Sequence, residues 1–349
     1  MSKEKPVIII DAMGGDFAPE ITVDGTCQMI AETNAHFILV GHEEKIKAEL
    51  AKHTYNKDQI SIVHTDEVIT NHDNPRAAVK DKKNASVLLA ARMLKEGKGD
   101  AMVSAGSTAA VVLAASLYIK RIPGVRRAAI GTIFPTLKED KHKSPYAVVM
   151  DVGANINNTA DDMVHYAYMG KTYLRELFGI QDPQVGLLNI GAEEHKGTDT
   201  LKEANKLLAS RDDLNFVGNI EGNDITNGKA DVIVSEGIHG NIAMKSIEGV
   251  AESAKKLAKM AMKGKFIWKL GLFFLQGGIK DILKYASYEE YGGAPIFGFN
   301  KLVVKSHGRC TAYAYKNGLR TTLNAVESGM IDFMRESISK FEADKEKSK

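Results

Sequence analysis

Small and hydroxyl-bearing residues close the apolar segment 101–104, in the turn Ser104-Ala-Gly106-Ser107-Thr108, and an apolar run follows over residues 109–120. Backbone N–H groups at the start of a helix have no partner inside it, and the helix dipole favours anions there. Small residues let an anion approach, and the two hydroxyls of Ser107 and Thr108 can donate. The turn is therefore a candidate phosphate site. A tight strand-to-helix connection with Ser or Thr capping is the alternative that this motif alone leaves open.

Three other turns carry polar residues of interest. Met13-Gly14-Gly15-Asp16 follows the apolar segment 7–10 and is either a similar anion site or a plain turn with Asp16 as a helix cap. Glu193-Glu-His-Lys196-Gly197 is either part of a site or a solvated turn. His307 is an acid–base candidate or a core histidine, and the residue by itself favours the core. Cys310 is expected to be a small buried residue.

Several familiar signatures are missing from the chain. It has no P-loop, no Gly-x-Gly-x-x-Gly after a strand, no His-Glu-x-x-His and no Gly-x-Ser-x-Gly elbow. Two cysteines cannot form a disulfide framework or a Cys-rich zinc site, and 46 Lys+Arg against 44 Asp+Glu argue against a nucleic-acid partner. The missing motifs argue against the ordinary P-loop, Rossmann, zinc-protease and α/β-hydrolase classes of protein.

The elements that must position these turns alternate along the chain. Short apolar runs at residues 7–10, 37–40, 101–104, 147–150, 185–190 and 230–234 each end in a glycine-containing turn and precede a helical pattern. Apolar runs of this length indicate strands buried on both faces, and the alternation indicates parallel βαβ units. We expect a three-layer α/β/α fold with a mainly parallel sheet. Ligands bind beyond the carboxyl ends of such strands, so the turns are expected to converge on one cleft.

The organisation along the chain is simple. A single domain is predicted over residues 1–335, with a helical hairpin protruding at about residues 250–285, and residues 336–349 read as a charged, solvated tail. The longest apolar stretch, residues 266–275, is interrupted by Lys269 and is too short to cross a bilayer. With no signal-peptide pattern, the chain is expected to be cytoplasmic.

Taken together, the motifs resemble the PlsX family of bacterial phosphate acyltransferases. The resemblance covers roughly residues 5–330 and lies in residues 9–19, 103–108, 151–155, 186–191, 193–197, 216–222, 240–242, 290–295 and 307–308. Each string is weak alone, but their order is highly specific. The chain departs from the family pattern at Ser107, at His239 and at Arg309-Cys310.

The resemblance implies an activity and partners. A fatty acyl group would pass from acyl carrier protein to inorganic phosphate, and the acyl phosphate would feed glycerol-3-phosphate acylation by a membrane acyltransferase. It also implies a fold similar to the phosphate acetyltransferase and isocitrate dehydrogenase-like group, and a homodimer. No cofactor and no metal are expected.

This chemistry needs positioning and oxyanion stabilisation more than acid–base groups, because phosphate is largely dianionic and a thiol with a pKa of ~8.5 leaves readily. On that basis the phosphate or acyl-phosphate site is assigned to Gly14, Gly15, Asp16, Ser104, Gly106, Ser107, Thr108 and Asn155. Lys196 is expected to stabilise charge, with Asn241 as a polar orienter and His307 as a further catalytic participant.

The predicted hairpin carries a second signal. Lys255, Lys259 and Lys263 recur every four residues and form one helical stripe, and Phe273 and Phe274 lie near the tip. Two interpretations are docking of the acidic carrier protein and binding to an anionic membrane at the inner face of the cell. A third interpretation is a dimer interface, which is compatible with both.

Two other classes of protein remain as alternatives. A decarboxylating dehydrogenase of the related fold would need clustered carboxylates for a divalent metal, and Asp161-Asp162 is the candidate pair. A non-catalytic module that binds acyl chains or the carrier protein would release no thiol.

Overall fold

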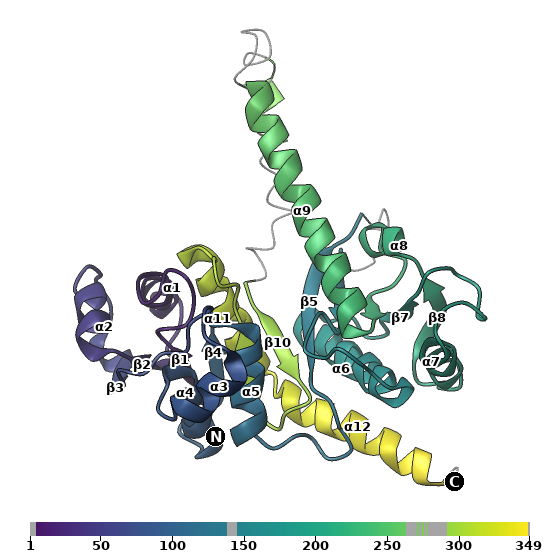
Figure 1. The fold of residues 1–349 in the computed structure, drawn as a ribbon, viewed down its shortest axis with the longest axis horizontal. Helices are drawn as coiled ribbons and strands as arrows, with labels where there is room; N and C mark the ends of the chain where they lie inside the picture. Colours follow the sequence, from purple (N-terminus) through teal and green to yellow (C-terminus); the bar gives the residue numbers. More distant parts are fainter. Residues whose placement is uncertain are drawn as a thin grey trace.

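The computed structural model describes residues 5–137, 145–262 and 292–347, together with Gly271, Phe274, Leu275 and Gly277. In this part of the chain a single sheet is flanked by helices (Figure 1). Its strands are β1 (Val7–Asp11), β2 (His36–Gly41), β3 (Ile60–His64), β4 (Ala101–Ser104), β5 (Ala129–Pro135), β6 (Tyr146–Met150), β7 (Gln184–Leu188), β8 (Asn215–Ile220), β9 (Val232–Val234), β10 (Ala294–Phe297) and β11 (Leu302–Lys305). The helices are α1 (Glu20–Ile30), α2 (Glu43–Leu50), the 3-10 turn η1 (Lys57–Gln59), α3 (Pro75–Asp81), α4 (Ser86–Lys95), α5 (Thr108–Tyr118), α6 (Ala160–Phe178), α7 (Asp199–Ala209), α8 (Gly222–Asn227), α9 (Gly237–Met262), α11 (Ala312–Glu327) and α12 (Met330–Lys347).

The strand order is β3-β2-β1-β4-β11-β10-β5-β6-β9-β7-β8. Strands β3 to β11 on one side pair in parallel, and so do β6 to β8 on the other. Between them, β10 pairs antiparallel with both β11 and β5, and β5 pairs antiparallel with β6. The mainly parallel sheet is confirmed, but the antiparallel centre was not expected. Because of this centre, the strands of one parallel half run antiparallel to the strands of the other half.

The three-layer arrangement follows from side chains that alternate between the two faces of each buried strand. In β1, Ile8 and Ile10 pack on one core with residues of α1, α6, α11 and α12, whereas Ile9 packs on the other with residues of α4 and α5. Strand β6 alternates in the same way, with Val148 and Val149 on opposite faces. Burial on both faces is the reason these strands read as continuous apolar runs.

The C-terminal segment differs from the prediction of a solvated tail. Residues up to Lys347 belong to α12, and Phe341 is only 2% exposed. The reason is an apolar stripe at helical spacing, in which Met330, Met334, Ile338 and Phe341 face the core beside α6. The many charged residues of this segment occupy the rest of the helix surface, so its composition alone suggests a solvated tail.

Helix α9 projects away from the body of the molecule (Figure 1). Its 26 residues span about 39 Å at 1.5 Å per residue, and they form the first arm of the predicted hairpin. Lys255 and Lys259 lie on it, and Lys259 is exposed. Lys263 and Phe273 lie outside the described residues, while Phe274 is exposed. None of the helices formed by described residues is long and apolar enough to cross a membrane.

Candidate active site

Three polar residues stand side by side at the carboxyl ends of neighbouring strands. Ser104 on β4 is in register with Asp11 on β1 and with Lys305 on β11. The Ser104 hydroxyl donates to Asp11 Oδ2 at 2.6 Å and accepts the Gly106 N–H at 3.0 Å. Ser104 is fully buried, so its hydroxyl shapes the following turn from behind. The sequence-predicted role of Ser104 as a direct phosphate ligand is thus not supported by its position, and we treat it as a positioning residue.

Two glycine turns pack against each other in front of this row. A Cβ at Gly14 would lie 2.5 Å from Asp11 Oδ2 and 2.7 Å from the Gly106 nitrogen, which is closer than real Cβ contacts come. Gly15 has φ +107°, a backbone conformation that favours glycine. The glycines of residues 13–16 are therefore explained by close approach of the 104–108 turn and by backbone conformation.

A cavity of about 250 Å³ opens beside the start of α5. Strand β5, helix α9 and the segments around β10 and β11 supply its walls. Its lining residues are Thr108, Ile130, Thr132, Ile133, Val152, Gly153, Asn241, Met244, Lys245, Glu248, Gly292, Gly293, Ala294, Lys305, Ser306 and His307. The structure thus brings the predicted Thr108, Asn241 and His307 together. We call this space the α5–α9 cavity.

Lys305 is a residue of this cavity that sequence reasoning missed. Burial, with a smaller contribution from nearby Lys245, lowers the pKa of its ammonium from 10.5 to about 8. Its Nζ donates to the Ala105 carbonyl at 3.5 Å and to the Ser306 carbonyl. No carboxylate in the described part of the chain forms an ion pair with it, whereas Lys245 is paired with Glu248 at 2.8 Å. The available signal was a single lysine at the end of the apolar run 302–304.

Ser306 and His307 continue the same wall. The Ser306 side chain is fully buried, and its Oγ has no hydrogen-bond partner among the described residues. His307 is exposed at the cavity, so the core interpretation favoured by the sequence is wrong for this residue. Desolvation and the neighbouring Lys245 lower the pKa of His307, which keeps the imidazole largely neutral at pH 7. Cys310 is buried, as predicted.

A second cavity, of about 320 Å³, lies on the other side of the same turn. Four predicted residues line it together with Met13 and residues 68–72, namely Gly15, Asp16, Gly106 and Ser107. The Ser107 hydroxyl makes no capping hydrogen bond to α5, so the capping alternative does not hold for it.

Asp16 is not a helix cap either, since Pro19 is the N-cap of α1. Its carboxylate accepts from Asn71 Nδ2 at 2.6 Å and from Arg309 Nε at 3.0 Å. These contacts compensate the charge and tie three segments together at the rim of the second cavity.

Asn155 and Asn241 have different surroundings. Asn155 Nδ2 lies within hydrogen-bond distance of Asp151, of the Ala128 carbonyl and of the Tyr166 hydroxyl, and Asn155 is absent from the cavity wall. Buried Asp151 also accepts several backbone N–H groups of its own turn. Asn155 therefore holds the turn after β6. Asn241 Nδ2 donates to the Val152 carbonyl at 2.9 Å and lines the cavity.

Lys196 is not among the residues that line either cavity. It follows β7, and β9 alone separates β7 from β6, the strand that precedes Val152 and Gly153 of the first cavity wall. Its own turn contains the contacts that position it, because its N–H donates to the Glu193 carbonyl and its carbonyl accepts from Asn189. The assignment of Lys196 to charge stabilisation stays a prediction.

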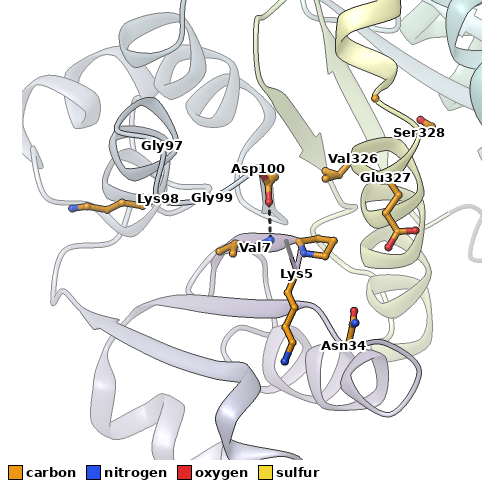
Figure 2. Close-up of a pocket in the computed structure, with 12 residues that line it drawn as sticks. Lys5, Val7, Asn34, Gly97, Lys98, Gly99, Asp100, Val326, Glu327 and Ser328 are labelled. Atoms are coloured by element: carbon orange, nitrogen blue, oxygen red, sulfur yellow. Dashed lines mark hydrogen bonds between the residues drawn. The ribbon is translucent and has the colours of Figure 1, made fainter. Parts of the chain in front are cut away.

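A larger cavity, of about 750 Å³, lies at the amino ends of β1 and β4 (Figure 2). Asp100 accepts the Val7 N–H there at 2.8 Å, and Glu327 at the end of α11 faces the same space. Lys305 and Ser104 are at the opposite ends of their parallel strands. This cavity is therefore separate from the candidate active site.

The carboxylate pair considered for a metal is engaged by cations. Asp162 caps α6 through Thr159 and pairs with Arg127 at 3.2 Å. Asp161 pairs with Arg126 at 3.5 Å and with Lys345 at 2.6 Å. The pair does not fit a divalent-metal site, and the dehydrogenase alternative loses the residues on which it depended.

The α/β fold of the chain is similar to that of solved phosphotransacetylases. A phosphotransacetylase from Streptococcus pyogenes superposes with a TM-score of 0.58 at 19% identity, over 97% of this chain and 95% of that one. Residues 7–333 match the family described as "Fatty acid synthesis protein". Proteins named "Phosphate acyltransferase" from Dictyoglomus turgidum and Dictyoglomus thermophilum are each 42% identical, covering 92% and 95% of this chain and 94% and 98% of those proteins. The chain belongs to this family of phosphate acyltransferases.

Proposed function

We propose that the protein transfers a fatty acyl group from acyl-[acyl carrier protein] to inorganic phosphate, giving acyl phosphate and the free carrier thiol. Family membership supports the reaction type. The observation that carries the proposal is the α5–α9 cavity, in which the start of α5 and Lys305 share the wall with the apolar side chains Ile130, Ile133 and Met244. Such a space suits an anion and an acyl group at the same time.

The chemistry is consistent with the groups present. An oxygen of HPO₄²⁻ attacks the thioester carbonyl, the tetrahedral oxyanion collapses, and the C–S bond breaks to release the pantetheine thiolate. The proton carried by the phosphate ends on that sulfur, so charge and atoms balance. A nucleophile that is already anionic needs no Ser-His-Asp triad, and the reaction as written requires neither metal nor organic cofactor. Backbone N–H groups, hydroxyls and a cation can stabilise the oxyanion.

The proposed partners extend this function. The acyl phosphate would serve a membrane glycerol-3-phosphate acyltransferase in phospholipid synthesis, and the protein would act in the cytoplasm and at the inner face of the membrane. On α9, Ile242, Val250 and Leu257 are exposed, which supports an apolar contact with a second copy of the chain in a homodimer. Lys259 on the same helix supports docking of the acidic carrier protein, and exposed Phe274 supports contact with lipid.

The decisive experiment follows carrier thiol release from acyl-[acyl carrier protein] in phosphate buffer, with sulfate at equal ionic strength as the control. Thiol should appear only with phosphate, and hydroxylamine added afterwards should capture one equivalent of acyl group as hydroxamate. Thiol release independent of phosphate would indicate a thioesterase. Binding of the acyl carrier without thiol release would instead identify a non-catalytic binding module, and either result would overturn the proposal.

A further inference from the structure

We propose that Lys305 is a catalytic residue whose ammonium group binds the attacking phosphate and passes a proton to the departing pantetheine thiolate. The proposal rests on the proposed function and assigns one residue a specific role in it.

The position of Lys305 in the sheet brings its amino group to the turn from Ser104 to Thr108. Strand β11 lies beside β4, and Lys305 is in register with Ser104. The side chain leans over the end of β4, because Nζ contacts the Ala105 carbonyl at 3.5 Å, three residues before α5 begins. An anion held by the first N–H groups of α5 would therefore meet this ammonium.

Lys305 forms no ion pair with a carboxylate in the described part of the chain. From β1, Asp11 faces it with Oδ2 accepting from Ser104, and from the following turn Asp16 is paired with Arg309; both carboxyl groups raise the pKa of Lys305. From α9, Lys245 faces it and is neutralised by Glu248.

Two further titratable groups lie next to Lys305. The Cys310 thiol is buried nearby, and His307 shares the cavity wall as a largely neutral ring. Cys310 raises the pKa of Lys305 and so acts against its desolvation. Buried Ser306 adds a hydroxyl to the same wall, and this hydroxyl has no hydrogen-bond partner among the described residues.

Proton transfer then proceeds in a balanced sequence. Lys305 is protonated when HPO₄²⁻ attacks, and as the C–S bond breaks it gives a proton to the sulfur. The phosphate hydroxyl becomes far more acidic once that phosphate is acylated, and its proton returns to the Lys305 amine. The products are the acyl phosphate dianion, the carrier thiol and protonated Lys305. A lysine suits this task better than an arginine, which remains protonated in proteins.

The test compares Lys305→Met and Lys305→Arg with the matched control Lys301→Met, which changes a lysine at the other end of the same strand segment. Steady-state rates are measured against phosphate with two substrates, an acyl thioester of pantetheine and one of an acidic aryl thiol. We expect Lys305→Met to lose ~10²-fold or more in kcat/KM for phosphate. Lys305→Arg should keep the KM for phosphate within a few-fold but lose kcat with the pantetheine thioester, and much of that loss should disappear with the aryl thioester. Lys301→Met should match the wild type.

The outcomes test the phosphate-binding role and the proton-transfer role of Lys305 separately. Normal phosphate saturation in a folded Lys305→Met protein would overturn the binding role, and an equal kcat loss with both thioesters in Lys305→Arg would overturn the proton-transfer role. Circular dichroism and thermal unfolding of each variant identify a loss caused by misfolding, in which case phosphate binding to Lys305→Arg, measured by calorimetry, replaces kinetics as the readout. Failure of the proposed function is distinguishable, because the wild type would then show no phosphate-dependent thiol release at all.

Discussion

The Ser104 hydroxyl donates a hydrogen bond to Asp11 across two neighbouring parallel strands, with 2.6 Å between Oγ and Oδ2. The same hydroxyl accepts the Gly106 N–H, so one buried side chain joins the end of β1 to the turn that starts α5. Burial raises the pKa of Asp11, while the Ser104 hydrogen bond acts against that rise. The turn from Ser104 to Thr108 is therefore held by a polar contact beneath it.

Ser104→Ala should weaken both the fold and the turn. The substitution leaves the Gly106 N–H and Asp11 Oδ2 without this buried partner, which typically costs about 1–3 kcal/mol. We expect that loss in urea unfolding, together with a raised KM for phosphate. Ser61→Ala, a serine on β3, serves as the control. An unchanged KM for phosphate with reduced stability would show that the hydrogen bond serves the fold alone.

Gly14→Ala and Gly106→Ala should differ in how much they destabilise the protein, although the two glycines are neighbours in space. A Cβ at Gly14 meets Asp11 Oδ2 at 2.5 Å, whereas one at Gly106 meets Ser104 Oγ at 3.1 Å. We expect Gly14→Ala to destabilise the protein by about 1–3 kcal/mol through overpacking. Gly106→Ala should destabilise it less, because a Cβ there points at the same buried side chains but has slightly more room. Equal unfolding midpoints for Gly14→Ala and the wild type would contradict this packing explanation.

The lowered pKa of Lys305 predicts a specific pH dependence of stability. Between about pH 8 and 10.5 the unfolded chain holds the Lys305 proton more tightly than the folded chain does. Unfolding free energy therefore rises with pH across this window, and the destabilising effect is fully present below pH 8. Compared with Lys305→Met, the wild type should gain about 1–3 kcal/mol from pH 8 to 10.5. A flat difference between the two proteins over this range would show that the ammonium is not desolvated.

Lys196→Gln tests the sequence-based assignment of charge stabilisation. If Lys196 acts on the oxyanion, turnover should fall ~10²-fold or more. Lys196 lines neither the α5–α9 cavity nor the second cavity, which instead leads us to expect little change in turnover. Turnover at saturating substrates is the measurement. A large loss in a folded variant would mean that the 193–197 turn reaches an active site in another arrangement of the chain or from a second copy.

Reversal of Lys255, Lys259 and Lys263 to Glu tests carrier docking. If these residues bind the acidic carrier protein, its KM should rise at low salt, and the penalty should shrink as ionic strength increases, because exposed charges are screened beyond ~8–10 Å. Reversal of Lys202, Lys206 and Lys229, which lie on other surfaces, controls for net charge. Unchanged carrier kinetics at low salt would leave the lysines as an ordinary solvated face.

The sequence alone determined the class of fold and the family. Strands buried on both faces must be apolar throughout, as in residues 7–10 and 147–150, and the turns at their ends must be small, so local composition reveals both. The turn from Ser104 to Thr108 was identifiable for the same reason. Where a property depends on residues close together in the chain, the sequence was sufficient.

Only the tertiary structure decided which turns share a site. The antiparallel strands β5 and β10 separate the two parallel halves of the sheet, and nothing local marks where strands will be inserted or which will pair. For this reason Lys196, which looked equivalent to other strand-end residues, lines neither cavity at the 104–108 turn, and Lys305, which looked like an ordinary strand residue, lies in the wall of one. The burial that changes the pKa of Lys305 arises from long-range packing, because desolvation depends on segments distant in the chain.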